Sequence, residues 1–420
     1  MVYIGGIIVI LTFAAIIKGY ETRLTLFVSG LVMSLLVLKP MAAFDAFFKT
    51  AAHSTLVPII CSVMGFAYVA KLTKCDEHLV RMLTDPLKKV QAILIPGAVI
   101  VTFVINIALT SAAGVSAAVG AILIPVLIGA GVKPEMAAAA VFAGTFGSVL
   151  SPGNAHNVYV ADLAKVEVMS IISVHALTSV ICGIISAVAL TVVAHIRGEV
   201  SGWASDSTAQ TSSTVQDGSI NVLMAIVPLI PLAILILATP QVGLLPKSIN
   251  VPTAMIIGAF IAWAVTRVKP REISKSFFEG MGYSYANVIG IIIAASVFTA
   301  GMGAIGLTDS LIEAMKRSEH VVRLGATFGP FLIAVLGGSG DAATLAFNAA
   351  ITPRAAEFGL SIPTLGSIAN LAGALGRTMS PVAGAAIVCA GIAKVNPIEL
   401  SKRTWPGMLI AAVVAMLMLL

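Results

Sequence analysis

The chain has 420 residues, of which 58% are hydrophobic and 10% charged, and its mean hydropathy is +1.03. This composition excludes an ordinary soluble domain and indicates a membrane protein with several spans. The formal net charge of +6 would suit a nucleic-acid partner, but the basic residues fall mainly in short loops between apolar segments, where they set membrane topology. We therefore expect the chain to contact a lipid bilayer and no nucleic acid.

The first half of the chain begins with three apolar runs, at 2–17, 24–38 and 54–70. Each is predicted to cross a hydrocarbon layer about 30 Å thick. Residues 76–85 then place apolar and charged side chains on separate faces at helical spacing. This pattern predicts a helix that lies in the membrane interface.

The apolar stretch 91–131 is too long for one span, and its centre, from Leu109 to Gly114, consists mainly of small and polar residues. Because this centre lacks the charges of an aqueous loop, we interpret the stretch as a re-entrant hairpin. Two complete spans joined by a turn are the alternative. A helix at 135–161, broken at Ser151-Pro152, and a span at 168–196 complete the half.

Residues 198–220 form a long polar stretch that is rich in Ser, Thr and Gly, which is typical of a linker. Beyond it the same order of segments returns. We predict spans at 221–238, 249–266 and 284–304, an amphipathic segment at 308–317, a hairpin at 322–359, a broken helix at 363–391 and a last span at 405–420.

Individual residues also repeat. The residues around the first helix break recur around the second at one constant spacing: Ala143, Gly144, Gly147, Ser151 and Pro152 return as Ala372, Gly373, Gly376, Ser380 and Pro381. Each half has five predicted transmembrane helices and one hairpin, and an odd number of crossings inverts the second half. The predicted fold is therefore all-α, with inverted repeats at 1–197 and 221–420, an architecture of secondary transporters. The face richer in Lys and Arg is expected to be cytoplasmic, which places both termini outside.

Four interruptions, the two hairpin tips and the two helix breaks, are expected to meet near the midplane, because irregular backbone survives in a bilayer only where it is buried or lines a cavity. The N–H end of a half-helix favours an anion, and the carbonyl end favours a cation. Packing of small residues between helices is the alternative role for many of the glycines and serines. The candidate substrate ligands are Thr110, Ser111, Gly114, Ser151, Gly153, Asn154, Asn157, Ser339, Gly340, Arg377, Thr378, Ser380 and Gly384.

Two charged residues, Arg377 and Asp341, fall inside segments that we place in the membrane. The guanidinium fork of Arg377 suits a carboxylate, while an ion pair with Asp341 and capping of free carbonyls are the alternatives. Asp341 is the main candidate ligand for a coupling ion, either a proton or a sodium ion at the hairpin tips. We expect Ser111, Asn154, Ser339 and Thr344 to assist it, and we interpret His156 as a structural residue.

The same segments resemble the DcuC family of C4-dicarboxylate transporters, within the ion-transporter superfamily. The resemblance rests on TSAAGVSAAVGAILIPV and SPGNAHN in the first half, and on SGDAATLAF and LGRTMSPVAGAAIVCAGIAKVNPIELSKRT in the second. It implies a secondary transporter that takes up or exchanges succinate, fumarate or related anions across a bacterial inner membrane. It also implies a homodimer in which a transport domain moves against a fixed scaffold, as in an elevator.

Other functions compete with this interpretation, and one of them is the transport of another organic anion by a member of the same superfamily. A sodium/proton antiporter of the same superfamily would require acids in the membrane core, where the sequence offers Asp341. A membrane-embedded hydrolase is the more distant alternative, but the chain has no HExxH motif, and Gly337-Gly-Ser-Gly-Asp341 lacks the last glycine of GxSxG. We therefore expect neither an enzyme nor an organic cofactor.

Overall fold

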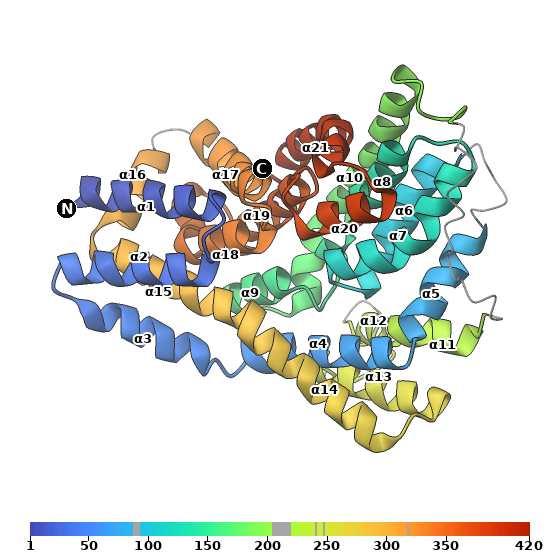
Figure 1. Cartoon of the computed structure of the whole chain (residues 1–420). Helices are drawn as coiled ribbons and strands as arrows, with labels where there is room; N and C mark the ends of the chain where they lie inside the picture. Colours follow the sequence, from blue (N-terminus) through green and yellow to red (C-terminus); the bar gives the residue numbers. More distant parts are fainter. Residues whose placement is uncertain (87–92, 204–219, 240–241, 247, 317–318) are drawn as a thin grey trace.

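The computed structural model describes residues 1–86, 93–203, 220–239, 242–246, 248–316 and 319–420. Every regular element in these ranges is a helix (Figure 1). Within them, five helices are long and apolar enough to cross a membrane, or six if one bent pair of helices counts as a span. The chain is therefore an all-helical protein of the polytopic membrane class, as its composition predicts.

The helices of the first half match the predicted segments closely. The predicted hairpin at 91–131 appears as α6 and α7, which are separated by Leu109–Ser111, and its first two residues lie outside the described ranges. The elements are α1 (Val2–Ile17), α2 (Thr22–Leu36), α3 (Pro40–Ala51), α4 (Leu56–Leu72), α5 (Cys75–Thr84), α6 (Leu94–Ala108), α7 (Ala112–Gly129), α8 (Pro134–Ala143), the 3-10 turn η3 (Gly147–Leu150), α9 (Ala155–Ala164) and α10 (Val168–Ile196).

The second half follows the same order, and most of the predicted linker at 198–220 lies outside the described ranges. The elements are α11 (Val222–Ile226), η4 (Val227–Leu229), α12 (Ile230–Leu237), α13 (Val251–Thr266), α14 (Pro270–Ser284), the π-helix η5 (Tyr285–Ile289), α15 (Gly290–Ala304), α16 (Leu307–Lys316), α17 (Glu319–Gly337), α18 (Gly340–Ala350), η6 (Thr352–Phe358), α19 (Ile362–Arg377), α20 (Gly384–Ala393) and α21 (Pro397–Leu419).

The structure corrects the predicted elements in three places. Helix α3 was not predicted, and it joins α4 in a pair bent by 49°. The span predicted to begin at 284 is the end of a continuous helix of 35 residues, Pro270–Ala304, and the last span begins at Pro397 rather than at 405. All three added segments carry charges that lower their hydropathy, yet each begins with proline at its first helical position, where the missing N–H is not needed.

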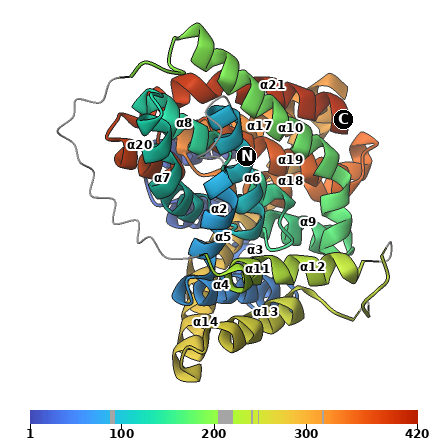
Figure 2. The same cartoon turned by 90° about the vertical axis from the view of Figure 1, so that its right-hand side faces the viewer.

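The helices pack in two groups. In one group α2 and α3 lie against α15 (Figure 1), and α4 lies against α13 and α14 (Figure 2). Small residues permit close backbone contact in this group, since a Cβ atom at Gly280 would lie 2.5 Å from Met64 O. The other group contains α6 to α10 and α17 to α21, with α10 packed against α21 and α7 against α20.

Helix α8 lies at the centre of the second group. Its residues from Met136 to Ala143 are all buried, as expected for a helix that is apolar on every side. The chain then bends past α6, where a Cβ atom at Gly147 would overlap Phe103 O. The glycines of the first helix break therefore allow the backbone of the break to lie directly on α6.

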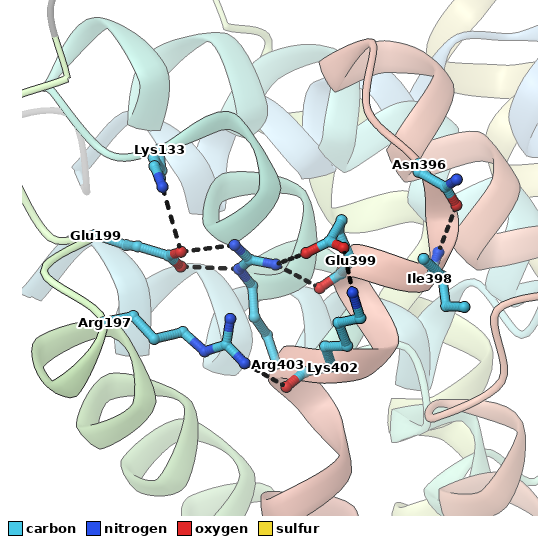
Figure 3. A network of polar contacts seen from close by, with 8 residues as sticks. All are labelled: Lys133, Arg197, Glu199, Asn396, Ile398, Glu399, Lys402 and Arg403. Carbon is cyan, nitrogen blue, oxygen red and sulfur yellow. Dashed lines mark hydrogen bonds and ion pairs between the residues drawn. The ribbon is translucent and has the colours of Figure 1, made fainter.

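A buried ion-pair network connects the end of α10 to the start of α21 (Figure 3). Arg403 Nε and Nη2 donate to the Glu199 carboxylate at 2.8 and 2.6 Å, and both side chains are only 3% exposed. Arg403 Nη1 also donates to the Glu399 carbonyl and carboxylate at 2.7 and 3.0 Å. Lys133 Nζ, in the loop between α7 and α8, lies 3.8 Å from Glu199. The network therefore fastens three segments that are distant in sequence.

Replacing Glu199 by Gln should lower the free energy of unfolding by up to about 3 to 5 kcal/mol, because the buried Arg403 guanidinium then keeps only the partly exposed Glu399 carboxylate as a charged partner. The thermal unfolding midpoint of the detergent-solubilised protein measures this effect. Glu279→Gln is the control, because Glu279 pairs with Lys275 at 3.7 Å with both side chains exposed, and such a pair contributes about 0 to 1 kcal/mol. Equal shifts in the two variants would show that the buried network does not stabilise the fold.

Candidate functional site

A cavity of about 490 Å³ lies where the predicted hairpin tips and helix breaks meet. The starts of α7, α9, α18 and α20 all border it. Each helix start carries N–H groups without intrahelical partners and a partial positive charge. The predicted site residues that line the cavity are Thr110, Ser111, Gly153, Asn154, Ser339, Gly340, Asp341, Arg377 and Gly384.

Three of these residues cap the helices that begin at the cavity. Ser111 Oγ accepts from Gly114 N at 3.1 Å at the start of α7, and Ser339 Oγ accepts from Ala342 N at 3.4 Å at the start of α18. Asn154 Oδ1 accepts from His156 N at 2.9 Å at the start of α9. No side chain caps α20, so its first N–H groups are the least satisfied of the four sets.

The second tip has one position that only glycine fits. Gly338 has φ +70°, and a Cβ atom there would lie 2.8 Å from the Val382 backbone. The left-handed conformation and the close contact both exclude larger residues. This glycine lets the tip of α17 and α18 lie directly against the second helix break.

The two embedded charges make separate contacts. Asp341 Oδ1 lies 3.1 Å from His156 Nε2, which joins α18 of the second half to α9 of the first. Arg377 Nη2 donates to Thr145 O at 2.7 Å, beyond the carbonyl end of α8. Among the described side chains no ion pair joins Arg377 to Asp341 within 4 Å. Arg377 instead caps the Thr145 carbonyl, and its side chain also borders the cavity.

Asn157 lies behind the cavity wall and is fully buried. Its Nδ2 group donates to Val149 O at 2.7 Å and to Ser151 O at 3.2 Å, two carbonyls of the first helix break. Its Oδ1 atom accepts from Asn370 Nδ2 at 3.2 Å, and Asn370 Oδ1 accepts from Asn348 Nδ2 at 2.8 Å. Asn348 and Asn370, which the sequence analysis missed, thus extend this support into the second half.

Five more predicted residues lie outside the cavity lining. Ser151 Oγ and Ser380 Oγ accept from the backbone N–H two residues further on, at 3.3 and 3.4 Å, so the two breaks have the same local turn. The Thr378 and Thr344 hydroxyls donate to carbonyls of α19, at 2.8 and 3.5 Å. Gly114 belongs to the first turn of α7. The hydroxyls of this set satisfy backbone groups.

A second wall of the cavity comes from helices that contain no predicted site residue. Arg23 and its neighbours Glu21 and Thr22 lie at the start of α2, while Tyr283 and Asn287 lie near the junction of α14 and the π-helix. Burial raises the pKa of Glu21, but hydrogen bonds from Leu24 N–H and Arg23 outweigh this effect and hold its pKa below the ordinary value. Glu21 is therefore ionised at neutral pH. From the sequence alone, Arg23 is one of the loop cations that are expected to set membrane topology.

Comparison with known proteins gives the relatives of the chain. The family model described as the C4-dicarboxylate anaerobic carrier, DcuC, matches residues 3–420. The anaerobic C4-dicarboxylate transporter DcuC of Escherichia coli K12 is 26% identical over 98% of this chain and 94% of its own length. A protein of Haemophilus influenzae named as an uncharacterized transporter is 44% identical over 65% of this chain and 100% of its own length.

Replacing Asn370 by Ala should lower the free energy of unfolding by about 1 to 3 kcal/mol for each of the two buried groups that lose their partner, Asn157 Oδ1 and Asn348 Nδ2. The unfolding midpoint of the purified protein measures the loss. The control is Asn396→Ala, which removes an exposed cap bond to Ile398 N at 3.0 Å and should cost about 1 kcal/mol. A loss in Asn370→Ala no larger than in the control would contradict a supporting role for the amide chain.

Proposed function

Because the chain belongs to the DcuC family of C4-dicarboxylate carriers, we propose that it transports C4 dicarboxylates such as succinate or fumarate through the cavity at its hairpin tips. It is a transporter and not an enzyme. The observation that carries the proposal is the convergence of four helix starts and Arg377 on one cavity. Both features favour an anion, and Arg377 offers the fork that fits a carboxylate.

The substrate carboxylate binds between Arg377 and the start of α20. This helix start has no side-chain cap, and a Cβ atom placed on Gly384 would meet only the Ala113 side chain, at 3.9 Å. An anion can therefore approach the free N–H groups closely. The substrate site is completed at the two tips and the first break by the hydroxyls of Thr110, Ser111 and Ser339 and by Gly153, Asn154 and Gly340.

The coupling ion binds beside the substrate, at Asp341. No group of three or more His, Cys, Asp or Glu residues that could hold a metal ion exists in the described part of the chain, so a sodium ion would draw its ligands from the oxygens of Ser111, Asn154 and Ser339. A proton would instead bind at Asp341, whose Oδ1 atom pairs with His156 Nε2 at 3.1 Å. This pair also makes a sodium/proton antiporter the second candidate function, and sodium flux in the absence of dicarboxylate would favour it.

The two halves form inverted repeats. In support, α2, α3 and α4 of the first half correspond to α13, α14 and α15 of the second. The contact of α2 with α15 then matches the contact of α13 with α4, and the contact of α3 with α15 matches the contact of α14 with α4. Cys182 Sγ of α10 donates to Ala411 O of α21, two positions 229 residues apart, which is the separation of Ser151 and Ser380. Lys165 and Lys394, at the ends of α9 and α20, both adopt left-handed φ angles, +57° and +56°.

The repeats support an elevator mechanism in a bacterial inner membrane. The group with the hairpins and broken helices would move as the transport domain against the group formed by α2 to α4 and α13 to α15, with both termini on the periplasmic side. A homodimer would hold the second group fixed. Hairpins of the re-entrant kind would carry the substrate site across with the moving domain.

Arg377→Lys keeps the charge but loses the guanidinium fork, and Arg377→Ala loses both. We expect succinate uptake into proteoliposomes to fall by about tenfold to a hundredfold in Arg377→Ala, since a charged hydrogen bond is worth about 1.5 to 3 kcal/mol, and by less in Arg377→Lys. Lys394→Gln, which removes an exposed charge outside the cavity, is the control and should transport normally. Full uptake by folded Arg377→Ala would contradict the carboxylate-binding role.

A further inference from the structure

The second wall of the cavity carries a cation of its own. Among the described lining residues, Arg23 and Arg377 are the only arginines, and no lysine joins them. Arg377 lies at the end of α19, beside the second helix break. Arg23 lies in the first turn of α2, in the group of helices that holds no hairpin or broken helix. The two guanidiniums therefore border one volume from different walls.

Arg23 is held in place from two sides. Its Nη1 atom donates to Ala286 O at 2.7 Å, inside the π-helix, and its Nε atom donates to Glu21 Oε1. Its Cδ atom lies over Gly290, where an added Cβ would be 3.3 Å away. π-turns widen a helix locally and are frequent at functional sites. The widened turn and the glycine together position the arginine at the cavity.

The first turn of α2, where Arg23 lies, is an unfavourable place for a cation because the charge there destabilises the helix. The start of a helix carries a partial positive charge that repels arginine and favours acids. Glu21 offsets the repulsion, because it caps α2 by accepting from Leu24 N at 2.6 Å and also pairs with Arg23. Helix stability alone thus explains Glu21 but gives no reason for the arginine.

Arg23 retains donors for a ligand. A guanidinium has five N–H donors, and within the described residues the contacts of Arg23 use only its Nε and Nη1 atoms. Its side chain is 41% exposed. A carboxylate needs two parallel N–H groups for a forked contact, and the remaining Nη1 and Nη2 donors supply them without displacing the bond to Ala286.

We propose that Arg23 binds the second carboxylate of a C4 dicarboxylate whose first carboxylate lies at Arg377 and the start of α20. The proposal rests on the proposed function, and it adds a specificity residue from the wall that lacks the hairpins. Two arginines on one cavity distinguish an anion with two carboxylates from an anion with one. Because the walls belong to different groups of helices, this contact exists only in conformations that bring them together.

Binding of succinate and of succinamate, which replaces one carboxylate by a neutral amide, tests the proposal by calorimetry on the purified protein. In Arg23→Gln the affinity for succinate should fall about tenfold or more, while the affinity for succinamate changes by less than about twofold. Arg23→Lys should recover part of the loss. Lys18→Gln, which removes a charge from the same loop but outside the cavity lining, should bind both compounds as the unmodified chain does.

Unchanged succinate affinity in Arg23→Gln, or an equal loss for succinate and succinamate, would overturn the role of Arg23 and leave the transport proposal intact. If the unmodified chain binds neither compound and transports no dicarboxylate, the proposed function itself fails. A thermal unfolding midpoint for Arg23→Gln that matches the unmodified chain shows that a loss of affinity is not a loss of folded protein.

Discussion

Every backbone polar group at the depth of a bilayer needs a partner, because lipid provides none. At the two helix breaks of this chain, backbone N–H and C=O groups lose their helical hydrogen-bond partners, and side chains around the breaks supply new ones. At the first break Asn157 binds Val149 O and Ser151 O, His175 Nε2 lies 3.0 Å from Val149 O, and Asn106 Oδ1 accepts from Ser148 N at 2.9 Å. Side chains from three helices, α6, α9 and α10, thus support this one interruption.

The carbonyl ends and the N–H ends at the helix breaks have different surroundings. Beyond the carbonyl end of α8, Thr145 O accepts from the Arg377 side chain at 2.7 Å. The N–H ends of α9 and α20 border the cavity instead, and α20 has no side-chain cap at all. Carbonyl groups are therefore neutralised within the protein while N–H groups remain available to a ligand. We expect this asymmetry to favour anions in the cavity.

Neither half of the chain forms the site alone. Arg377 of the second half caps the first break, Asp341 pairs with His156 of the first half, and Asn370 extends the support of Asn157 across the same boundary. The contribution of the halves is nonetheless unequal. At the tips and breaks, the first half brings capped helix starts and neutral amides, whereas the second brings Arg377, Asp341 and the uncapped start of α20.

The sequence was sufficient for the parts that hydrophobicity and local residue chemistry determine. Helices α1, α2, α6, α7 and α10 and both helix breaks occur where apolar runs, Ser-Pro and glycines predict them. Helices α3 and α14 escaped prediction because their charged faces lower the hydropathy. The second cavity wall escaped for another reason: the approach of Arg23 to a π-helix 263 residues away is a tertiary contact that no local pattern encodes. The same holds for the link between Asn157 and Asn370.

The central claim is that C4 dicarboxylates bind in the cavity with one carboxylate at Arg377 and the start of α20. An electron cryomicroscopy map of the protein in lipid nanodiscs with succinate tests this claim most directly. The account predicts ligand density in the cavity, with carboxylate oxygens within hydrogen-bonding distance of the Arg377 guanidinium and of the N–H groups of Gly384 and Ala385. Succinate density at another place in the protein, with the start of α20 facing only water, would contradict it.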